Sequence, residues 1–239
     1  YVGEFPGQVE EDSNFDGEVD RWVTYVGGKT STVEQDRDFD GEKDLRAELD
    51  PDGSKRLEQQ DTNKDGVYDV TIHFEKGEKV RIEEDTNGDG RADVITYTHG
   101  DEIVRREADS DKNGRFDSVA FFEKGKERRQ TRDADGDGKD ELVIFLDADG
   151  KKTREEVDAN KDGRRELVRI FENGKKVREE EDQNGDGKPE VVTTFDAETP
   201  LRREADTNGD GRKDTFVEFH AGKKASQQED RDGDGKIDA

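Results

Sequence analysis

Short acidic side chains recur in this sequence at fixed positions of a nine-residue motif. The motif has Asp at position 1, Asn or Asp at positions 3 and 5, Gly at position 6, and Asp or Glu at position 9. Side chains at positions 1, 3 and 5 can converge on one point if the backbone curls, and glycine permits the sharp turn that the curl needs. Clustered carboxylate and amide oxygens suit Ca²⁺, which takes about six to eight oxygen ligands. Ten copies, here loop 1 to loop 10, begin at Asp12, Asp36, Asp61, Asp85, Asp109, Asp133, Asp158, Asp182, Asp206 and Asp230.

We predict that each loop binds one Ca²⁺, giving about ten ions, through the side chains at positions 1, 3, 5 and 9 and the backbone carbonyl of position 7. In loops 1 to 5 the predicted ligands are Asp12, Asn14, Asp16, Glu18 and Asp20; Asp36, Asp38, Asp40, Glu42 and Asp44; Asp61, Asn63, Asp65, Val67 and Asp69; Asp85, Asn87, Asp89, Arg91 and Asp93; and Asp109, Asp111, Asn113, Arg115 and Asp117. In loops 6 to 10 they are Asp133, Asp135, Asp137, Lys139 and Glu141; Asp158, Asn160, Asp162, Arg164 and Glu166; Asp182, Asn184, Asp186, Lys188 and Glu190; Asp206, Asn208, Asp210, Arg212 and Asp214; and Asp230, Asp232, Asp234, Lys236 and Asp238.

The motif resembles the first half of an EF-hand loop and the calcium loops of dockerins, thrombospondin type 3 repeats and integrin-type propellers. An EF-hand loop ends with a bidentate Glu at position 12 and lies between two helices. Position 12 is never acidic here, as Val23, Ile72 and Arg169 illustrate. We therefore expect the acid at position 9 to supply that ligand, and we do not expect a helix-opening calcium sensor.

The segments between the loops have the composition of short strands. The loops recur every 24 or 25 residues, and each is followed by a run rich in β-branched and aromatic residues, as at 70–74, 142–146 and 191–195. A tight turn such as Asn173-Gly174 comes next, and a charged run such as 176–180 leads back to the following loop. No apolar stripe of helical period follows the loops. Each repeat is thus predicted to be strand, turn, strand and calcium loop.

These repeats predict an all-β chain of tandem β-hairpins of about 24 residues joined by Ca²⁺ loops, an elongated array. Residues 1–239 form one array in this prediction, with partial repeats at 1–11 and 230–239. A closed β-propeller-like ring and a β-solenoid are the alternatives. Tyr1 and Ala239 both fall inside predicted strands. Either the chain is a piece of a longer array, or its two ends complete one hairpin.

The composition is that of a chain which cannot fold around an apolar core. The 239 residues carry a formal charge of −25, and only 26% are hydrophobic, a balance typical of disorder. Ten Ca²⁺ ions would bring the charge to −5, so we expect calcium to order a chain that is largely unfolded without it. The absence of Cys excludes disulfides and thiolate metal sites. No apolar run is long enough for membrane insertion, and the acidity argues against nucleic acid as a partner.

A Glu or Gln stands two residues before nine of the ten loops, as at Glu34 and Glu83. It is either a supplementary ligand or, in the interpretation we favour, part of an ion pair with an Arg across the sheet. The three histidines lie in different repeats without a nucleophile, and all ten acidic clusters are alike. We therefore do not expect an enzyme.

These expectations favour an extracellular or cell-surface structural protein, such as a stalk, spacer, surface layer or fibre subunit, that Ca²⁺ folds and rigidifies. Loops of this type suit the affinities of about 10⁻⁴–10⁻³ M seen in extracellular modules. Copies of the chain, or further repeats of a longer chain, are candidate partners. The alternative is a calcium-dependent adhesion module that binds carbohydrate or protein. The apolar residues that depart from the repeat, Trp22, Tyr97 and Phe121, are its only hints.

Overall fold

The computed structural model describes residues 7–238, and every regular element among them is a β-strand. The described part of the chain has no helix that could serve as a membrane span. The chain divides into two compact units, Tyr1–Phe116 and Asp117–Ala239. The boundary lies within loop 5, and the same hairpin repeat builds both units. Residues 1–6 and 239, which include most of the predicted N-terminal partial repeat, lie outside the described residues.

The first unit contains β1 (Gln8–Glu11), β2 (Arg21–Val26), β3 (Lys29–Gln35), β4 (Leu45–Leu49), β5 (Lys55–Gln60), β6 (Val70–Glu75), β7 (Glu78–Glu84), β8 (Val94–His99) and β9 (Glu102–Ala108). The second unit contains β10 (Ser118–Glu123), β11 (Lys126–Arg132), β12 (Leu142–Leu146), β13 (Lys152–Val157), β14 (Leu167–Glu172), β15 (Lys175–Glu181), β16 (Val191–Asp196), β17 (Thr199–Ala205), β18 (Thr215–His220) and β19 (Lys223–Glu229).

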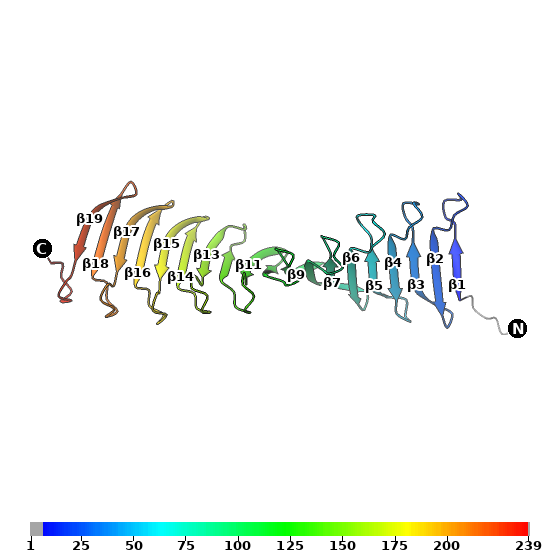
Figure 1. The fold of residues 1–239 in the computed structure, drawn as a ribbon, viewed down its shortest axis with the longest axis horizontal. Coiled ribbons are helices and arrows are strands. Elements are labelled where there is room, and N and C mark those ends of the chain that lie inside the picture. The colour runs from blue at the N-terminus through cyan, green and yellow to red at the C-terminus, as the bar shows by residue number, and fades with distance from the viewer. Residues whose placement is uncertain (1–6, 239) are drawn as a thin grey trace. The chain divides into compact units, whose positions relative to one another are not determined.

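Within each unit the strands form an open antiparallel sheet in which every strand pairs with its neighbours in sequence (Figure 1). Tight turns and the nine-residue loops alternate as the connections. This confirms the predicted all-β hairpin array. The two alternatives are wrong for the described residues of each unit. No pairing closes the strands into a ring, and a solenoid of successive coils would require parallel strands.

The tight turns explain why successive strands fold back as hairpins. In the β6–β7 hairpin, Lys76 and Gly77 both have positive φ, 52° and 84°, as a two-residue type I′ turn requires. The Asn173-Gly174 turn repeats this geometry, with φ of 52° and 79°. A β-bulge interrupts the register next to the turn, between His73 and Phe74. Bulges increase the local twist, and the same irregularity recurs in the other tight hairpins of both units.

Backbone hydrogen bonds join each loop to the sheet and to the loop before it. The Asp44 amide, at position 9 of loop 2, donates to the carbonyl of Gln35 at 3.0 Å. The Asp36 amide, at position 1, donates to the carbonyl of Asp20 in loop 1 at 2.9 Å. Equivalent bonds recur along the loop edges of both units. The position-1 bond is present in loops 2 to 10 and the position-9 bond in loops 1 to 4, 9 and 10, so backbone hydrogen bonds fix at least one end of each loop.

Apolar side chains contribute little to the interior of either unit. The buried hydrophobic residues among those described are Val23, Ala47, Ile72, Ile95, Val143, Val191, Val192 and Ala205. Loop aspartates at positions 1 and 9 are buried just as deeply, namely Asp20, Asp36, Asp44, Asp61, Asp93, Asp109, Asp117, Asp158 and Asp214. Buried carboxylates are stable only when paired or hydrogen-bonded. What holds these nine aspartates therefore decides how the chain folds.

Charged and aromatic side chains cover the sheet where a hydrophobic protein would have a second layer. Arg169 donates to Glu155 at 2.5 Å and to Glu179 at 2.9 Å across neighbouring strands. The Lys176 ammonium lies 4.0 Å from the centre of the Phe195 ring and 3.2 Å from a Glu179 carboxylate oxygen. Such contacts stabilise a surface modestly. They provide a face in which long polar side chains pack on one another.

Candidate metal sites

The aspartate at position 1 organises each loop by accepting backbone hydrogen bonds. In loop 7, Asp158 Oδ1 accepts from the amides of Lys161 at 2.7 Å and Asp162 at 3.2 Å, and Oδ2 accepts from Gly163 at 2.7 Å. The bond from the position-6 glycine recurs in all ten loops at 2.6–3.0 Å. These bonds curl the backbone around the carboxylate. They explain why a residue that is charged can also be buried.

Positions 3 and 5 tighten the same curl. Asn160 Oδ1 accepts from the Asp162 amide at 2.9 Å, and Asp162 Oδ1 accepts from the amide of Arg164, at position 7, at 2.8 Å. A carboxylate oxygen pair has about four lone-pair sites, so one backbone bond leaves capacity for a cation. The direction of the position-7 carbonyl, the fifth predicted ligand, stays a prediction.

The curl places position 4 in the left-handed region of φ in every loop. Five loops have glycine there, such as Gly185 with φ of 72°. The other five have Phe15, Phe39, Lys64, Lys112 or Lys161, with φ between 60° and 65°. A residue with a Cβ is strained by roughly 1–2 kcal/mol in this region. The loop hydrogen bonds must therefore outweigh that strain in half of the loops.

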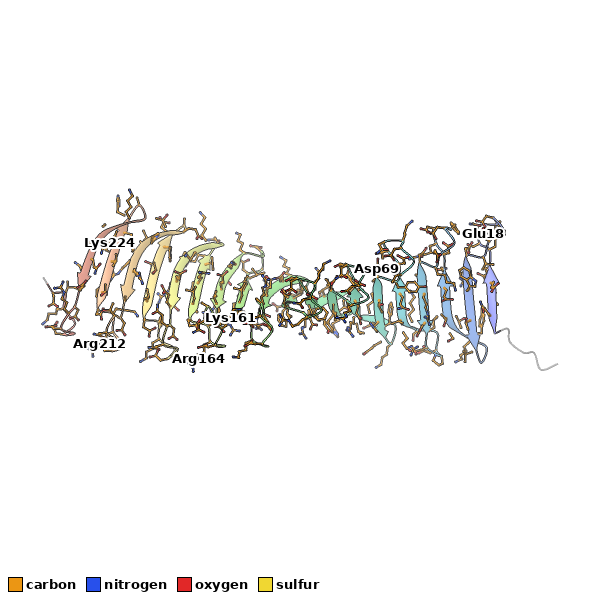
Figure 2. The ribbon with its side chains drawn as sticks, in the orientation of Figure 1. Glu18, Asp69, Lys161, Arg164, Arg212 and Lys224 are labelled. Atoms are coloured by element: carbon orange, nitrogen blue, oxygen red, sulfur yellow. The ribbon has the colours of Figure 1, made fainter. Side chains whose placement is uncertain are left out.

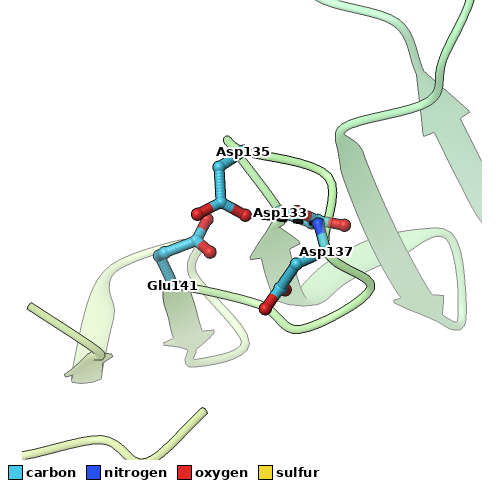
Figure 3. Close-up of side chains that lie close together, drawn as sticks. All are labelled: Asp133, Asp135, Asp137 and Glu141. Carbon is cyan, nitrogen blue, oxygen red and sulfur yellow. Dashed lines mark hydrogen bonds between the residues drawn. The ribbon is translucent and has the colours of Figure 1, made fainter. Parts of the chain in front are cut away.

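Carboxylate oxygens gather in five loops. In loop 6 all four acids, Asp133, Asp135, Asp137 and Glu141, place an oxygen within 4.8 Å of one another (Figure 3). The other groups are Asp36, Asp38 and Asp40; Asp158, Asp162 and Glu166; Asp182, Asp186 and Glu190; and Asp230, Asp232 and Asp234. Two ligands of one Ca²⁺, each about 2.3–2.6 Å from the ion, are at most about 5 Å apart. The spacing of these oxygens therefore fits a single calcium ion.

Two buried carboxylate oxygens in these groups have no hydrogen-bond donor. They are Glu166 Oε1 in loop 7 and Asp230 Oδ1 in loop 10. A buried charged oxygen without a partner is costly, and a bound cation would satisfy it. This is the strongest sign, apart from the motif itself, that the loops are built to hold a metal ion.

The aspartates at position 9 point to a contact that the sequence analysis missed. In loop 4 the Asp93 carboxylate accepts from the Thr86 amide at 2.8 Å and from the Thr86 hydroxyl at 2.5 Å. Position 2 supplies the same kind of side-chain donor in four other loops, from Ser13, Arg37, Thr62 and Thr207. The Thr86 hydroxyl bond is the main cause that holds the pKa of Asp93 below its ordinary value. In these loops the position-9 aspartate, which we predict to be a direct ligand, also accepts hydrogen bonds from within the loop.

Lysines at position 4 connect neighbouring loops. Lys64 of loop 3 forms an ion pair with Asp38 of loop 2 at 2.5 Å, and Lys161 of loop 7 pairs with Asp135 of loop 6 at 3.1 Å. These lysines are the main cause that holds the pKa of each of the two aspartates below its ordinary range. Both lysines reach a predicted calcium ligand, so a cation already lies beside these two loops. Figure 2 shows Lys161, Arg164 and Arg212 at the loop edge of the second unit, and Lys224 at the opposite edge.

The glutamates two residues before the loops form ion pairs, as we predicted. Most of their partners, however, lie on the same strand and not across the sheet. Glu180 pairs with Arg178 at 2.7 Å, and Glu204 pairs with Arg202 at 2.9 Å. Each arginine lies two residues earlier on the same strand, and not across the sheet, because side chains at i and i+2 share a face. Glu34 is an exception, since its carboxylate accepts from Lys43, a loop residue, at 2.7 Å.

The three apolar residues singled out from the sequence each lie under a cation. Lys43 lies 4.5 Å from the Trp22 ring centre, and Arg guanidinium groups lie 5.6 Å from Tyr97 and 5.2 Å from Phe121. These rings take part in the side-chain packing of the sheet. The most exposed aromatic residue among those described is instead Phe15 in loop 1, at 89%.

Comparison with known proteins found no family model that matches this chain and no similar curated protein. Among the described residues, the repeated loop geometry brings together four predicted carboxylate ligands in loop 6 and three in each of loops 2, 7, 8 and 10.

Proposed function

We propose that this chain is a calcium-binding structural repeat protein in which one Ca²⁺ ion holds each loop together. The observation that supports this most directly is the gathering of carboxylate oxygens within 4.8 Å in loops of one repeated geometry. The buried, donor-free oxygens of Glu166 and Asp230 fit the same interpretation. Hard oxygen donors of this kind favour Ca²⁺ over transition metals, which prefer nitrogen or sulfur ligands.

Calcium would supply the stability that a hydrophobic core supplies elsewhere. A ligand at ten times its Kd stabilises the form that binds it by about 1.4 kcal/mol per site. Over the ten loops of this chain that amounts to about 14 kcal/mol, at the upper end of the 5–15 kcal/mol typical of whole domains. Because each hairpin contacts mainly its neighbours, we expect this stabilisation to be distributed along the sheet. The chain would stiffen locally wherever a loop is loaded.

Equilibrium dialysis with metal analysis tests the binding, and far-UV circular dichroism tests its structural role. We expect close to ten bound Ca²⁺ per chain at saturation, fewer with Mg²⁺ as the matched divalent control, and loss of the β spectrum in chelator. A chain that binds no Ca²⁺ at millimolar concentration would refute the function. A β spectrum that persists in chelator would refute the folding role alone.

We further propose that the protein works outside the cell, as a stalk, spacer, surface layer or fibre subunit. Exposed loops of this type have expected dissociation constants near 10⁻⁴–10⁻³ M, which match extracellular calcium. Titration calorimetry measures this directly. Submicromolar affinity at most loops would favour a cytosolic role and contradict the proposal.

A calcium-dependent adhesion module is the second candidate. Phe15 and Phe39 stand at position 4 of loops 1 and 2, with 89% and 48% of their surface exposed, where other loops have Gly or Lys. Exposed aromatic rings at a strained position contribute little to folding and are suited to a ligand. Surface binding that is lost on Phe15→Gly and Phe39→Gly substitution, with calcium stoichiometry unchanged, would favour adhesion over a purely structural role.

A further inference from the structure

Positions 2 and 9 of the loops vary together. Where position 9 is Asp, position 2 carries a side-chain donor, namely Ser13, Arg37, Thr62, Thr86, Ser110, Thr207 or Arg231. Where position 9 is Glu, in loops 6, 7 and 8, position 2 is Ala134, Ala159 or Gln183. The three Glu loops are consecutive and lie in the second unit. The two alanines have no side-chain donor, and the Gln183 side chain donates to Glu181 at 3.4 Å and not to Glu190. Two loop classes are therefore present.

In loops 1, 2, 3, 4 and 9, hydrogen bonds from within the loop engage both oxygens of the position-9 aspartate. In loop 10, by contrast, Arg231 donates its amide to Asp238 Oδ2 and its side chain to Glu229. In loop 9, Asp214 Oδ1 accepts from the Thr207 hydroxyl at 2.8 Å, and Oδ2 accepts from the Thr207 amide at 3.0 Å. In loop 2, Arg37 donates to both oxygens of Asp44, from Nε and from the amide, each at 2.6 Å. Loops 1, 3 and 4 are engaged in the same way. A calcium ion must compete with these bonds for the lone pairs of the carboxylate.

In the Glu loops the extra methylene group places the carboxylate differently. Oε2 accepts the position-2 amide, at 2.5 Å for Glu141, 3.0 Å for Glu166 and 2.6 Å for Glu190. Each of these glutamates also belongs to its loop's group of gathered oxygens, which no position-9 aspartate does among the described residues. Glu166 Oε1 is buried and has no donor. This oxygen is independent of the loop hydrogen bonds, and a cation is the partner that it lacks.

Space for coordinating water lies beside loop 7. Ala159, Glu166 and Gln183 line part of a shallow cavity of about 520 Å³ between loops 7 and 8. A cavity of about 430 Å³ also lies beside loop 9, where position 2 is Thr207, so this space does not distinguish the two classes. Ca²⁺ commonly completes its coordination with water, so the surroundings of the Glu loops suit an ion held partly by protein and partly by solvent.

We propose that loops 6, 7 and 8 form a high-affinity calcium block that fills before loops 1, 2, 3, 4 and 9, because in those five loops hydrogen bonds already engage both oxygens of the position-9 carboxylate. This inference rests on the proposed calcium binding. Competition with a charged hydrogen bond costs enough to weaken one of these Asp loops about tenfold or more relative to a Glu loop. The residue at position 2 would thus set the affinity of its loop without contacting the ion.

The experiment follows the position-6 glycine amides of the full-length chain during a calcium titration. Each of these amides is bonded to the position-1 aspartate, so its ¹⁵N–¹H signal reports on its own loop. With ¹⁵N-glycine labelling, we expect Gly138, Gly163 and Gly187 to reach their loaded positions at roughly tenfold lower calcium than Gly90 and Gly211. Glycine signals from the other loops show whether each variant below remains folded.

Two double variants exchange the residues at positions 2 and 9 between the loop classes, and they test whether these residues cause the difference in calcium affinity. The double variant A159T/E166D converts loop 7 to the Asp class, and T86A/D93E converts loop 4 to the Glu class. We expect the midpoint for Gly163 to rise about tenfold in the first and that for Gly90 to fall about tenfold in the second. If all loops load at one concentration, or if the exchanges leave the midpoints unchanged, this inference fails while calcium binding stands. If no glycine responds to calcium, the proposed function itself fails.

Discussion

Replacing Asp158 with Ala removes the acceptor around which loop 7 curls. Asp158 is 3% exposed and accepts the amides of Lys161, Asp162 and Gly163. Those three amides lie in exposed residues, so water can replace the lost acceptor, and each bond is worth about 1 kcal/mol. The loop should lose about 3 kcal/mol of local stability, a factor of about 150 in its opening equilibrium. One bound calcium ion should be lost as well.

Amide hydrogen exchange in saturating calcium measures this change at a single residue. We expect protection of the Gly163 amide to fall by at least about 150-fold, because the lost calcium ion adds to the lost hydrogen bonds, while amides in loops 9 and 10 keep theirs. The matched control is Asp149→Ala, which removes the same charge from the β12–β13 turn at the opposite edge of the sheet. The Asp149 amide donates to Asp147, and this bond does not need the Asp149 side chain.

Unchanged protection at Gly163 in Asp158→Ala would show that the position-1 carboxylate does not organise the loop. Equal loss of protection in Asp149→Ala would show that net charge, and not the geometry of the loop, controls its stability. Either result would refute the reasoning.

Three further predictions concern other contacts. Phe15→Gly should stabilise loop 1 by about 1 kcal/mol, because φ at Phe15 is 65° and the ring is exposed; slower exchange of the loop 1 amides would show it. Lys64→Gln should raise the pKa of Asp38, whose main depressing contact is the Lys64 ammonium, and carboxyl NMR titration measures this. Because the Asp38 pKa is lowered in the folded chain, its stabilising contribution is complete above the ordinary aspartate value of about 3.9 and is lost as pH falls through the folded value; the variant should lose less stability in acid. Arg169→Met should destabilise the β13–β15 region by about 1–3 kcal/mol, because the buried Glu155 carboxylate loses a partner; urea titration should show no change if the pair is only a surface contact.

The elements were predictable because each depends on a local signal. Gly77 and Gly174 mark turns that require positive φ, and the runs between turns and loops are too short and too β-branched for helices. The loop hydrogen bonds of position 1 follow from the same residue types that define the motif. A one-dimensional array suits such prediction, since few contacts join residues distant in sequence.

Contacts between side chains were less predictable. The Thr86–Asp93 bond joins residues seven positions apart that become neighbours only after the loop has curled. The residue types at positions 2 and 9 change together when the repeats are aligned on position 1, and this correlation indicates the contact between the two positions. The sequence favours a partner for Glu180 on the neighbouring strand, whereas the structure pairs it with Arg178, which shares its face on the same strand. Choosing between such partners requires rotamers, which the sequence does not specify.

The neighbour-only pairing of the strands has a consequence for how the length of such a protein can change. Deleting residues 158–181 would join Val157 directly to Asp182, which occupies the same repeat position as Asp158. The junction preserves the order of strand, loop and turn, and no distant contact is lost. Duplication of residues 158–181 would likewise preserve the strand pairing on both sides of the insertion. Gain or loss of single repeats in the gene can therefore change the number of strands in the sheet without changing how the remaining repeats pack.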